Sequence, residues 1–265
     1  MSESSGEVLR SEESARVRLL TLDRPDALNA FNDELYDALC RALDSAANDP
    51  GIATVVITGA GRAFSAGQDL GEMAHPPKYP DGERHGFIPF IERVESFPKP
   101  LIAAVNGIGV GIGLTLLPHC DLVLIARGAR LRAPFVSLGV TAEAGSSLLL
   151  PQRIGWQSAA HLLYTASWLE AEQAVEVGLA WRLCEPEKLL DEALSTAREI
   201  AQMPIDSLVT TKTLLLDARL DAVRTARARE DRRFARLAGG PANREALAAF
   251  EERRAPDFTK LPTTD

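Results

Sequence analysis

The sequence predicts an α/β fold. Short apolar runs that end at Gly-, Asp- or Pro-containing turns alternate with segments in which apolar residues recur at helical spacing, and this alternation is typical of α/β proteins. The alternation covers the first half of the chain, whereas residues 145–253 show mostly helical patterns. We therefore expect a flexible N-terminus over residues 1–12, an α/β core over residues 13–200 and a helical subdomain over residues 201–265.

The N-terminal quarter begins with an expected strand at Val17–Leu22, which ends before an Asp-Arg-Pro turn. Asn32 is a suitable N-cap for the helix that follows, because its side-chain oxygen can accept a hydrogen bond from a free N–H group of the first turn. The next strand is expected over residues 52–58. The helix between them is expected to extend to about Ala47, and its apolar face is formed by Leu35, Leu39, Leu43 and Ala46.

A glycine-rich segment, ITGAGRAFSAGQDL at residues 57–70, changes abruptly from apolar to small residues. Small residues allow a ligand to approach the backbone closely and leave peptide N–H groups free to point at it, which is what a developing oxyanion requires. The segment therefore indicates a site where a carbonyl group is polarised, although an ordinary tight turn explains the same spacing. Residues 71–86, rich in Pro, Gly and charged residues, are expected to form a mobile loop beside the ligand.

The middle of the chain contains further strands and a second glycine-rich turn. A helix is expected over residues 87–97, then a buried strand at Leu101–Val105. Glycines alternate with other residues over 106–113, and a helix is expected from there to about Pro118. Strands at Leu122–Ala126 and residues 131–133 follow. The remaining helices are expected at residues 145–152, 157–165, 170–177, 186–202, 204–218, 220–237 and 241–253.

The composition of the 265-residue chain argues against several classes of protein. A formal net charge of -8 and a pI near 5.2 disfavour a nucleic-acid binder, which needs a basic surface. The chain has no run of about 18 apolar residues for a membrane span, and its N-terminus lacks the apolar core of a signal peptide. We therefore expect a cytoplasmic protein. Free buried thiols without metal-ligand spacing are expected at Cys40, Cys120 and Cys184.

Several cofactor and catalytic motifs do not fit the sequence. The glycines of residues 107–113 do not satisfy G-x-G-x-x-G in any register, so a dinucleotide site is not expected. A phosphate-binding G-x-x-x-x-G-K-[ST] loop and a G-x-S-x-G nucleophile elbow are both missing from the sequence. The four histidines show no metal-ligand spacing, so no metal site is expected, and His119, beside a proline, is expected to be structural.

Three segments occur in an order that points to a family: LDRPDALNAFN at residues 22–32, ITGAGRAFSAGQDL at residues 57–70, and KPLIAAVNGIGVGIGLTLLPHCDLVL at residues 99–124. Together they resemble the crotonase, or enoyl-CoA hydratase/isomerase, superfamily, and APFVSLG followed by LPQRIG extends the match over nearly the whole chain. The resemblance implies a spiral of ββα units with a C-terminal helical trimerisation region, and a homotrimer or a dimer of trimers. It also implies an acyl-CoA thioester substrate and no permanently bound cofactor, because coenzyme A is part of the substrate.

The resemblance also assigns substrate-binding residues. The thioester carbonyl oxygen is expected to accept hydrogen bonds from the backbone N–H groups of Gln68 and Ile112, which would form an oxyanion hole. Residues 24–30 match the strip that lines the CoA tail in the family, and Ala66 falls where the family binds adenine through its backbone. Candidates for the CoA phosphates, which could instead be solvated surface cations, are Arg24, Lys212 and Lys260. Further contacts with the substrate are expected from Ala27, Leu28, Ala30, Asp69, Leu70, Ile108, Thr115, Phe135 and Val140.

The residues that determine the type of reaction differ from the hydratase pattern. The two catalytic glutamates of family hydratases correspond to Thr115 and Phe135, neither of which can act as a general base. Glu143 instead matches the catalytic glutamate of peroxisomal-type Δ3,Δ2-enoyl-CoA isomerases, and one buried carboxylate suits a proton transfer from C2 to C4. Asp69 is the other candidate for the catalytic acid, but its carboxylate is expected to stabilise its own loop by accepting hydrogen bonds from N–H groups.

Three alternatives stay open beside the isomerase. Glu143 could be a first-turn acid that only stabilises the next helix. The chain could be an enoyl-CoA hydratase or another crotonase-type enzyme, such as a dienoyl-CoA isomerase or a thioester hydrolase. It could also be an acyl-CoA binder without catalytic activity.

Overall fold

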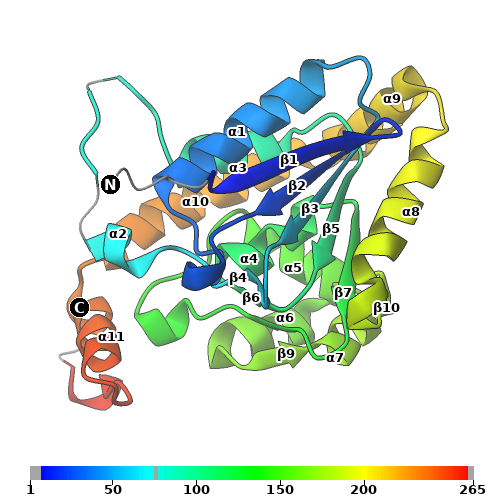
Figure 1. Cartoon of the computed structure of the whole chain (residues 1–265). Coiled ribbons are helices and arrows are strands. Elements are labelled where there is room, and N and C mark those ends of the chain that lie inside the picture. The colour runs from blue at the N-terminus through cyan, green and yellow to red at the C-terminus, as the bar shows by residue number, and fades with distance from the viewer. Residues whose placement is uncertain (1–6, 75–76, 81, 262–265) are drawn as a thin grey trace, which may run out of the picture.

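The computed structural model describes residues 7–74, 77–80 and 82–261. Its largest sheet has six strands (Figure 1). The strand order is β1-β2-β3-β5-β7-β10, with β1 antiparallel to β2 and the other neighbours parallel. The parallel strands β3 and β5 are buried along their whole length, which explains their continuous apolar sequence. The strands of this sheet are β1 (Leu9–Ser14), β2 (Val17–Leu22), β3 (Thr54–Gly59), β5 (Leu101–Val105), β7 (Leu122–Ala126) and β10 (Arg182–Cys184).

A second sheet of four short strands takes the alternate strands of the chain, in the order β4-β6-β8-β9. The successive pairs β3–β4, β5–β6 and β7–β8 each place their first strand in the large sheet and their second strand in the small one. Helical segments follow each pair, so the chain repeats a ββα unit. The strands of the small sheet are β4 (Ala63–Ser65), β6 (Ile108–Val110), β8 (Arg130–Arg132) and β9 (Trp168–Glu170).

Helices cover the sheets and form the C-terminal part of the chain (Figure 1). Helix α8 packs across β2, β3, β5 and β7, whereas α1 packs against α3, and α10 packs against α5. No described helix combines the length and the apolar composition that a membrane crossing requires. The α-helices are α1 (Asp33–Asn48), α2 (Leu70–Ala74), α3 (Phe87–Glu95), α4 (Ile112–Thr115), α5 (Ser146–Ile154), α6 (Trp156–Thr165), α7 (Ala171–Glu176), α8 (Leu189–Ala201), α9 (Ile205–Asp217), α10 (Leu220–Leu237) and α11 (Pro241–Glu251). The short 3-10 helices are η1 (Pro25–Ala27), η2 (Leu117–His119), η3 (Val136–Leu138), η4 (Pro186–Lys188) and η5 (Phe258–Lys260).

The structure confirms the predicted α/β class, and several predicted bounds match those of β2, β5, β7 and α10. The prediction of a flexible N-terminus is wrong for residues 9–12, because β1 pairs with β2 along its whole length. Residues 1–6 lie outside the described residues. The backbone ladder orders β1 although its side chains are mostly exposed, so the sequence carries no apolar signal for it. The segment 71–86, expected to be a loop, contains most of the helix α2. The sequence did not predict the strands β4, β6, β9 and β10, because three residues are too few to show a periodic pattern.

The three cysteines agree with the prediction of free, buried thiols. Cys40, Cys120 and Cys184 are all free and buried, and each lies among apolar neighbours of the core.

Replacing Asn32 with alanine should lower the free energy of unfolding by about 1 kcal/mol, because the helix α1 loses its N-cap. The Asn32 side-chain oxygen accepts a 3.1 Å hydrogen bond from the backbone N–H of Leu35, which has no partner within the helix. Urea denaturation followed by circular dichroism measures the change. As a control, Asn48→Ala removes an exposed amide at the other end of α1, and it should change stability by less than about 0.5 kcal/mol. Equal effects of the two variants would contradict the capping role.

Candidate active site

Two glycine turns meet at the ends of β4 and β6. Gly67 has a φ of 95°, and a Cβ atom on it would lie 2.8 Å from the carbonyl oxygen of Val110. Gly111, with a φ of 54°, precedes α4, and a Cβ atom on it would lie 3.8 Å from the Cα atom of Gly67. Both conformations are left-handed, so they favour glycine. The sequence folds in this way here because no side chain occupies the space between the turns.

Two residues of these turns line the same cavity and have backbone N–H groups without an acceptor among the described residues. Ile112 is the first residue of α4, so its N–H group has no partner within the helix. The Gln68 backbone is fixed by its neighbours, since Phe31 donates to the Gly67 carbonyl (2.7 Å) and accepts from the Asp69 N–H group (2.8 Å). Within the described part of the chain, no acceptor binds the N–H group of Gln68 or of Ile112. Both residues line a cavity of about 400 Å³.

An ion pair braces the first turn. The Arg24 guanidinium donates to Asp69 Oδ2 (3.0 Å) and to the Ala30 carbonyl oxygen (2.5 Å), and Asp69 Oδ1 accepts from the N–H groups of Gly71 and Glu72 at the start of α2. Partial burial raises the pKa of Asp69, but the hydrogen bonds from Arg24 and from these N–H groups outweigh it, so this pKa lies below its ordinary value. Asp69 is therefore an ionised bracing group, as the sequence predicted for it.

Glu143 lines the same cavity as the two free N–H groups and is the only carboxylate among its described lining residues. Its side chain is half-buried, and its Oε1 atom accepts a 3.4 Å hydrogen bond from the hydroxyl group of the fully buried Thr115. Burial raises the pKa of Glu143 to about 7; the negative charges of Glu230 and Asp231 add to this, and the Thr115 hydrogen bond opposes it.

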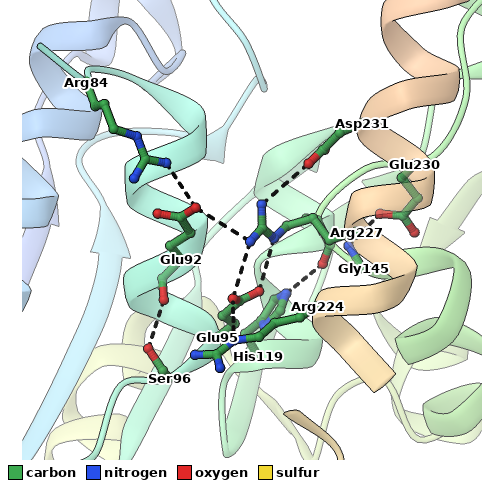
Figure 2. Close-up of polar contacts among 11 residues, drawn as sticks. Arg84, Glu92, Glu95, Ser96, His119, Gly145, Arg224, Arg227, Glu230 and Asp231 are labelled. Carbon is green, nitrogen blue, oxygen red and sulfur yellow. Dashed lines mark hydrogen bonds and ion pairs between the residues drawn. The ribbon is translucent and has the colours of Figure 1, made fainter. Parts of the chain in front are cut away.

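Contacts from distant elements fix the backbone around Glu143 (Figure 2). The buried carboxylate of Glu230, on α10, accepts hydrogen bonds from the N–H groups of Gly145 (2.6 Å) and Ser147 (2.8 Å). The His119 Nε2 atom lies 2.8 Å from the carbonyl oxygen of Ala144, and burial lowers the pKa of this histidine to about 4. His119 is therefore neutral, and it donates to Ala144 through Nε2. This role is structural, as expected.

A further part of the cavity lining comes from α10, α11 and the segment after α11; the sequence predicted neither helix to be near the site. The Asn243 side chain donates to the Leu138 carbonyl oxygen (2.8 Å), which fixes α11 on η3. Apolar residues at helical spacing on α11 are the one sequence signal that could have indicated this contact. The lining residues from this wall include Phe234, Asn243, Ala246, Leu247, Phe250, Arg254 and Pro256.

Some of the predicted substrate-binding residues line the cavity and others lie behind its wall. Gln68, Ile112 and Glu143 line it together with Ala66, Leu70, Phe135 and Val140. Leu28 accepts a 2.9 Å hydrogen bond from the Ala66 N–H group, so the strip of residues 24–30 lies directly beside Ala66. The predicted residues that do not line the cavity are Arg24, Ala27, Leu28, Ala30, Asp69, Ile108 and Thr115. Of these, Thr115 reaches the site through its hydrogen bond to Glu143.

The prediction that Lys212 binds a CoA phosphate is wrong. Its side chain is 5% exposed, and its ammonium group donates to the Lys99 carbonyl oxygen (2.7 Å) and to Asp121 (2.8 Å), so it ties α9 to the sheet. Lys260 is exposed, forms an ion pair with Asp257 (2.7 Å) and does not line the cavity, so its role stays a prediction. No group of three or more His, Cys, Asp or Glu side chains in the described ranges could hold a metal ion.

Replacing Glu143 with glutamine should stabilise the protein, and more so at pH 8 than at pH 5. The pKa of this carboxyl rises from the ordinary 4.5 to about 7 on folding, so ionisation penalises the folded state increasingly between these values. We expect the gain in unfolding free energy to be about 2 kcal/mol larger at pH 8. Urea denaturation at both pH values measures it. The exposed carboxylate of Glu187 is the control, since Glu187→Gln should change stability little at either pH. A gain that does not depend on pH would contradict the raised pKa.

Comparisons with known proteins identify the family of the chain. Residues 12–261 match the sequence profile of the family described as Enoyl-CoA hydratase/isomerase. The 1,2-epoxyphenylacetyl-CoA isomerase of Escherichia coli K12 is 37% identical over 96% of this chain and 98% of its own, and the 2,3-dehydroadipyl-CoA hydratase of the same strain is 36% identical over 92% and 95%. A crystal structure of an enoyl-CoA hydratase/isomerase from Pseudoalteromonas atlantica T6c superposes with a TM-score of 0.92, at 36% identity, over 95% of this chain and 99% of that one. The chain belongs to the enoyl-CoA hydratase/isomerase (crotonase) family of acyl-CoA enzymes.

Proposed function

We propose that this protein is a Δ3,Δ2-enoyl-CoA isomerase in which Glu143 carries the proton. The observation that supports this most concerns the cavity lined by Gln68 and Ile112. Among the described residues, a single carboxylate, with a pKa of about 7, lines it, and no acceptor binds the backbone N–H groups of these two residues. A base with a pKa near the working pH transfers protons efficiently. Two N–H donors in a partly water-excluded site stabilise a negative oxygen.

The proposed reaction needs only these groups. The ionised Glu143 carboxylate removes a proton from C2 of a 3-enoyl-CoA, and the negative charge is delocalised onto the thioester oxygen as a dienolate. The N–H groups of Gln68 and Ile112 donate to that oxygen, and the loss of one such donor typically slows a reaction about 100-fold or more. Glu143, now a carboxylic acid, returns the proton to C4, which leaves the double bond between C2 and C3. The carboxylate is regenerated, and no water is consumed.

A hydratase is the second candidate, because the relatives include a protein named 2,3-dehydroadipyl-CoA hydratase. Addition of water across a double bond needs a base to activate the water and an acid to protonate the neighbouring carbon. At the two positions where the family hydratases are expected to carry glutamates, this chain has the buried Thr115 and Phe135. The Thr115 hydroxyl donates to Glu143, so one hydroxyl and one carboxylate are available for a water molecule, which favours the isomerase over the hydratase.

The proposal includes the assembly and location that the resemblance implies, a homotrimer or a dimer of trimers in the cytoplasm, with coenzyme A arriving as part of the substrate. Large apolar side chains exposed on the surface support an interface between copies. The most exposed among the described residues are Trp156 and Tyr164 on α6 and Leu214 and Leu215 on α9. Arg24 and Lys260 stay candidates for the CoA phosphates within the same proposal.

Replacing Glu143 with glutamine should reduce kcat for isomerisation of 3-hexenoyl-CoA by about 1,000-fold, because the variant retains the shape of the side chain but cannot accept the C2 proton. Chromatography of the 2-enoyl product measures the rate. The Kd for hexanoyl-CoA, which has no double bond to move, should change by less than about 3-fold. Full activity of the variant would refute the assignment of Glu143, and wild-type protein that binds hexanoyl-CoA without isomerising 3-hexenoyl-CoA would favour the non-catalytic binder.

Replacing Thr115 with valine should have a much smaller effect, about 10-fold or less on kcat, because the hydroxyl only orients and tunes Glu143. Loss of its hydrogen bond raises the pKa of Glu143 further, so the acidic limb of the pH–rate profile should move to higher pH. Product analysis with 2-hexenoyl-CoA completes the test. If the wild type forms 3-hydroxyhexanoyl-CoA rapidly and the valine variant loses this activity, water handling by Thr115 is shown and the hydratase is favoured.

A further inference from the structure

A second cavity, of about 330 Å³, lies beyond Glu143 on the side of α1, α3 and α10. The two cavities share four lining residues, Gln68, Met73, Glu143 and Phe234, so the proposed reaction centre lies at their junction. The first cavity holds the turn residues that face the thioester oxygen, whereas the second is bounded by helices. Its other lining residues are Asp33, Phe87, Ile88, Asp231 and Ala235.

We propose that the second cavity holds the distal part of the acyl group, and that Asp231 makes it select a neutral apolar group over an anionic one. This inference rests on the proposed function in one respect, namely that C2 to C4 of the acyl chain lie at Glu143. A chain whose carbonyl group points at Gln68 and Ile112 and whose C4 lies at Glu143 continues into the second cavity, which Glu143 also lines.

The apolar part of this wall suits a hydrocarbon group. Phe87 and Ile88 on α3, Phe234 and Ala235 on α10, and Met73 on α2 all line the cavity. A dry cavity of about 150 Å³ already holds a benzene molecule, so the larger volume here accommodates a ring or an extended chain of several carbons. Burial of such a group removes apolar surface from water, which stabilises the complex.

The charged side chains that line the second cavity are all negative among the described residues. Three carboxylates, those of Asp33, Glu143 and Asp231, line the cavity, and no described lysine, arginine or histidine lines it. Arg227 and Arg232 lie near Asp231, and neither lines the cavity. Arg227 is 12% exposed and is bound to Glu95 and to Asp231 Oδ2 (3.4 Å), so it is not free to meet a ligand (Figure 2), whereas Arg232 is exposed on the surface of α10. A carboxylate at the end of an acyl chain would therefore face like charges in a partly buried site, where repulsion is stronger than in water.

Asp231 is held in this position by a network between α3 and α10 (Figure 2). Glu95, which is 3% exposed, accepts hydrogen bonds from Arg227 (3.2 and 3.5 Å) and from Arg224 (3.3 Å). Glu92 lies 3.7 Å from Arg227 and also pairs with Arg84. Because Arg227 is fixed by Glu95, the carboxylate bound to it cannot readily turn away from an anionic ligand. The second oxygen of Asp231 has no hydrogen-bond partner among the residues that the structure describes.

The test compares the binding of matched saturated thioesters, which cannot be isomerised. Isothermal titration at pH 8 gives the Kd of hexanoyl-CoA and adipyl-CoA, and of octanoyl-CoA and suberyl-CoA, pairs that differ only in a terminal carboxylate. We expect the wild type to bind the neutral member of at least one pair roughly 10- to 100-fold more tightly. Asp231→Asn should reduce this ratio at least about 3-fold, and combination with Asp33→Asn should reduce it further.

A matched control separates a local charge from the net charge of the protein. Asp221→Asn removes one carboxylate from the exposed start of the same helix, about 15 Å along its axis from Asp231, and should leave the ratio as in the wild type. Three outcomes would each overturn the proposal. The wild type could bind the neutral and the anionic thioester of both pairs with equal Kd, Asp231→Asn could leave the ratio of the two Kd values unaltered, or Asp221→Asn could change this ratio as much as Asp231→Asn does. Tight binding of hexanoyl-CoA by Asp231→Asn shows that this variant is folded. These ligands do not react, so the binding test is independent of catalysis. If the protein binds neutral thioesters more tightly than anionic ones but has no isomerase activity, the proposed reaction is refuted and the selectivity for neutral acyl groups is established.

Discussion

The site depends on the close approach of two turns at a point where a side chain has no room. Gly67 lies against the backbone of Val110 and Gly111, so the segments after β4 and β6 pass each other at contact distance. Their strands are neighbours in the small sheet, and the ββα repeat brings these strands together. Gln68 and Ile112 are more than forty residues apart in sequence, yet both thereby line one cavity, and the described residues offer no acceptor for either backbone N–H group.

The carboxylate across the cavity depends on contacts of longer range. The backbone on the C-terminal side of Glu143 is held by Glu230 from α10 and by His119 from η2, and its hydroxyl partner, Thr115, ends α4. Burial raises the pKa of Glu143, and the carboxylates of α10 raise it further. Helix α10 therefore contributes to two properties of the site, the position of the proton-carrying group that we propose and its basicity.

Sequence patterns predicted those elements whose structure depends on residues close to one another in the sequence. The Asn32 cap and the apolar periodicity of α1 lie within one helix, and the motif around Gln68 and Ile112 marks the turns directly. The strand β6 was missed, since Gly109 at its centre has no side-chain pattern and depends on Leu131 and Gly113 packed against it. Lys212 was misassigned because its partner, Asp121, is distant in sequence. The same limit applies to Glu230, which no spacing rule connects with Gly145.

The wall formed by α11 has a consequence for truncated forms of the protein. Helix α11 starts at residue 241, is fixed to η3 by Asn243 and supplies Ala246, Leu247 and Phe250 to the cavity. The two turns come first in the chain, Glu143 next and this wall last, so the groups that we propose for catalysis all precede the residues of α11 that line the cavity. A chain cut back to the end of α10 would retain Gln68, Ile112 and Glu143 but lack the α11 side of the cavity in which we propose that the thioester binds.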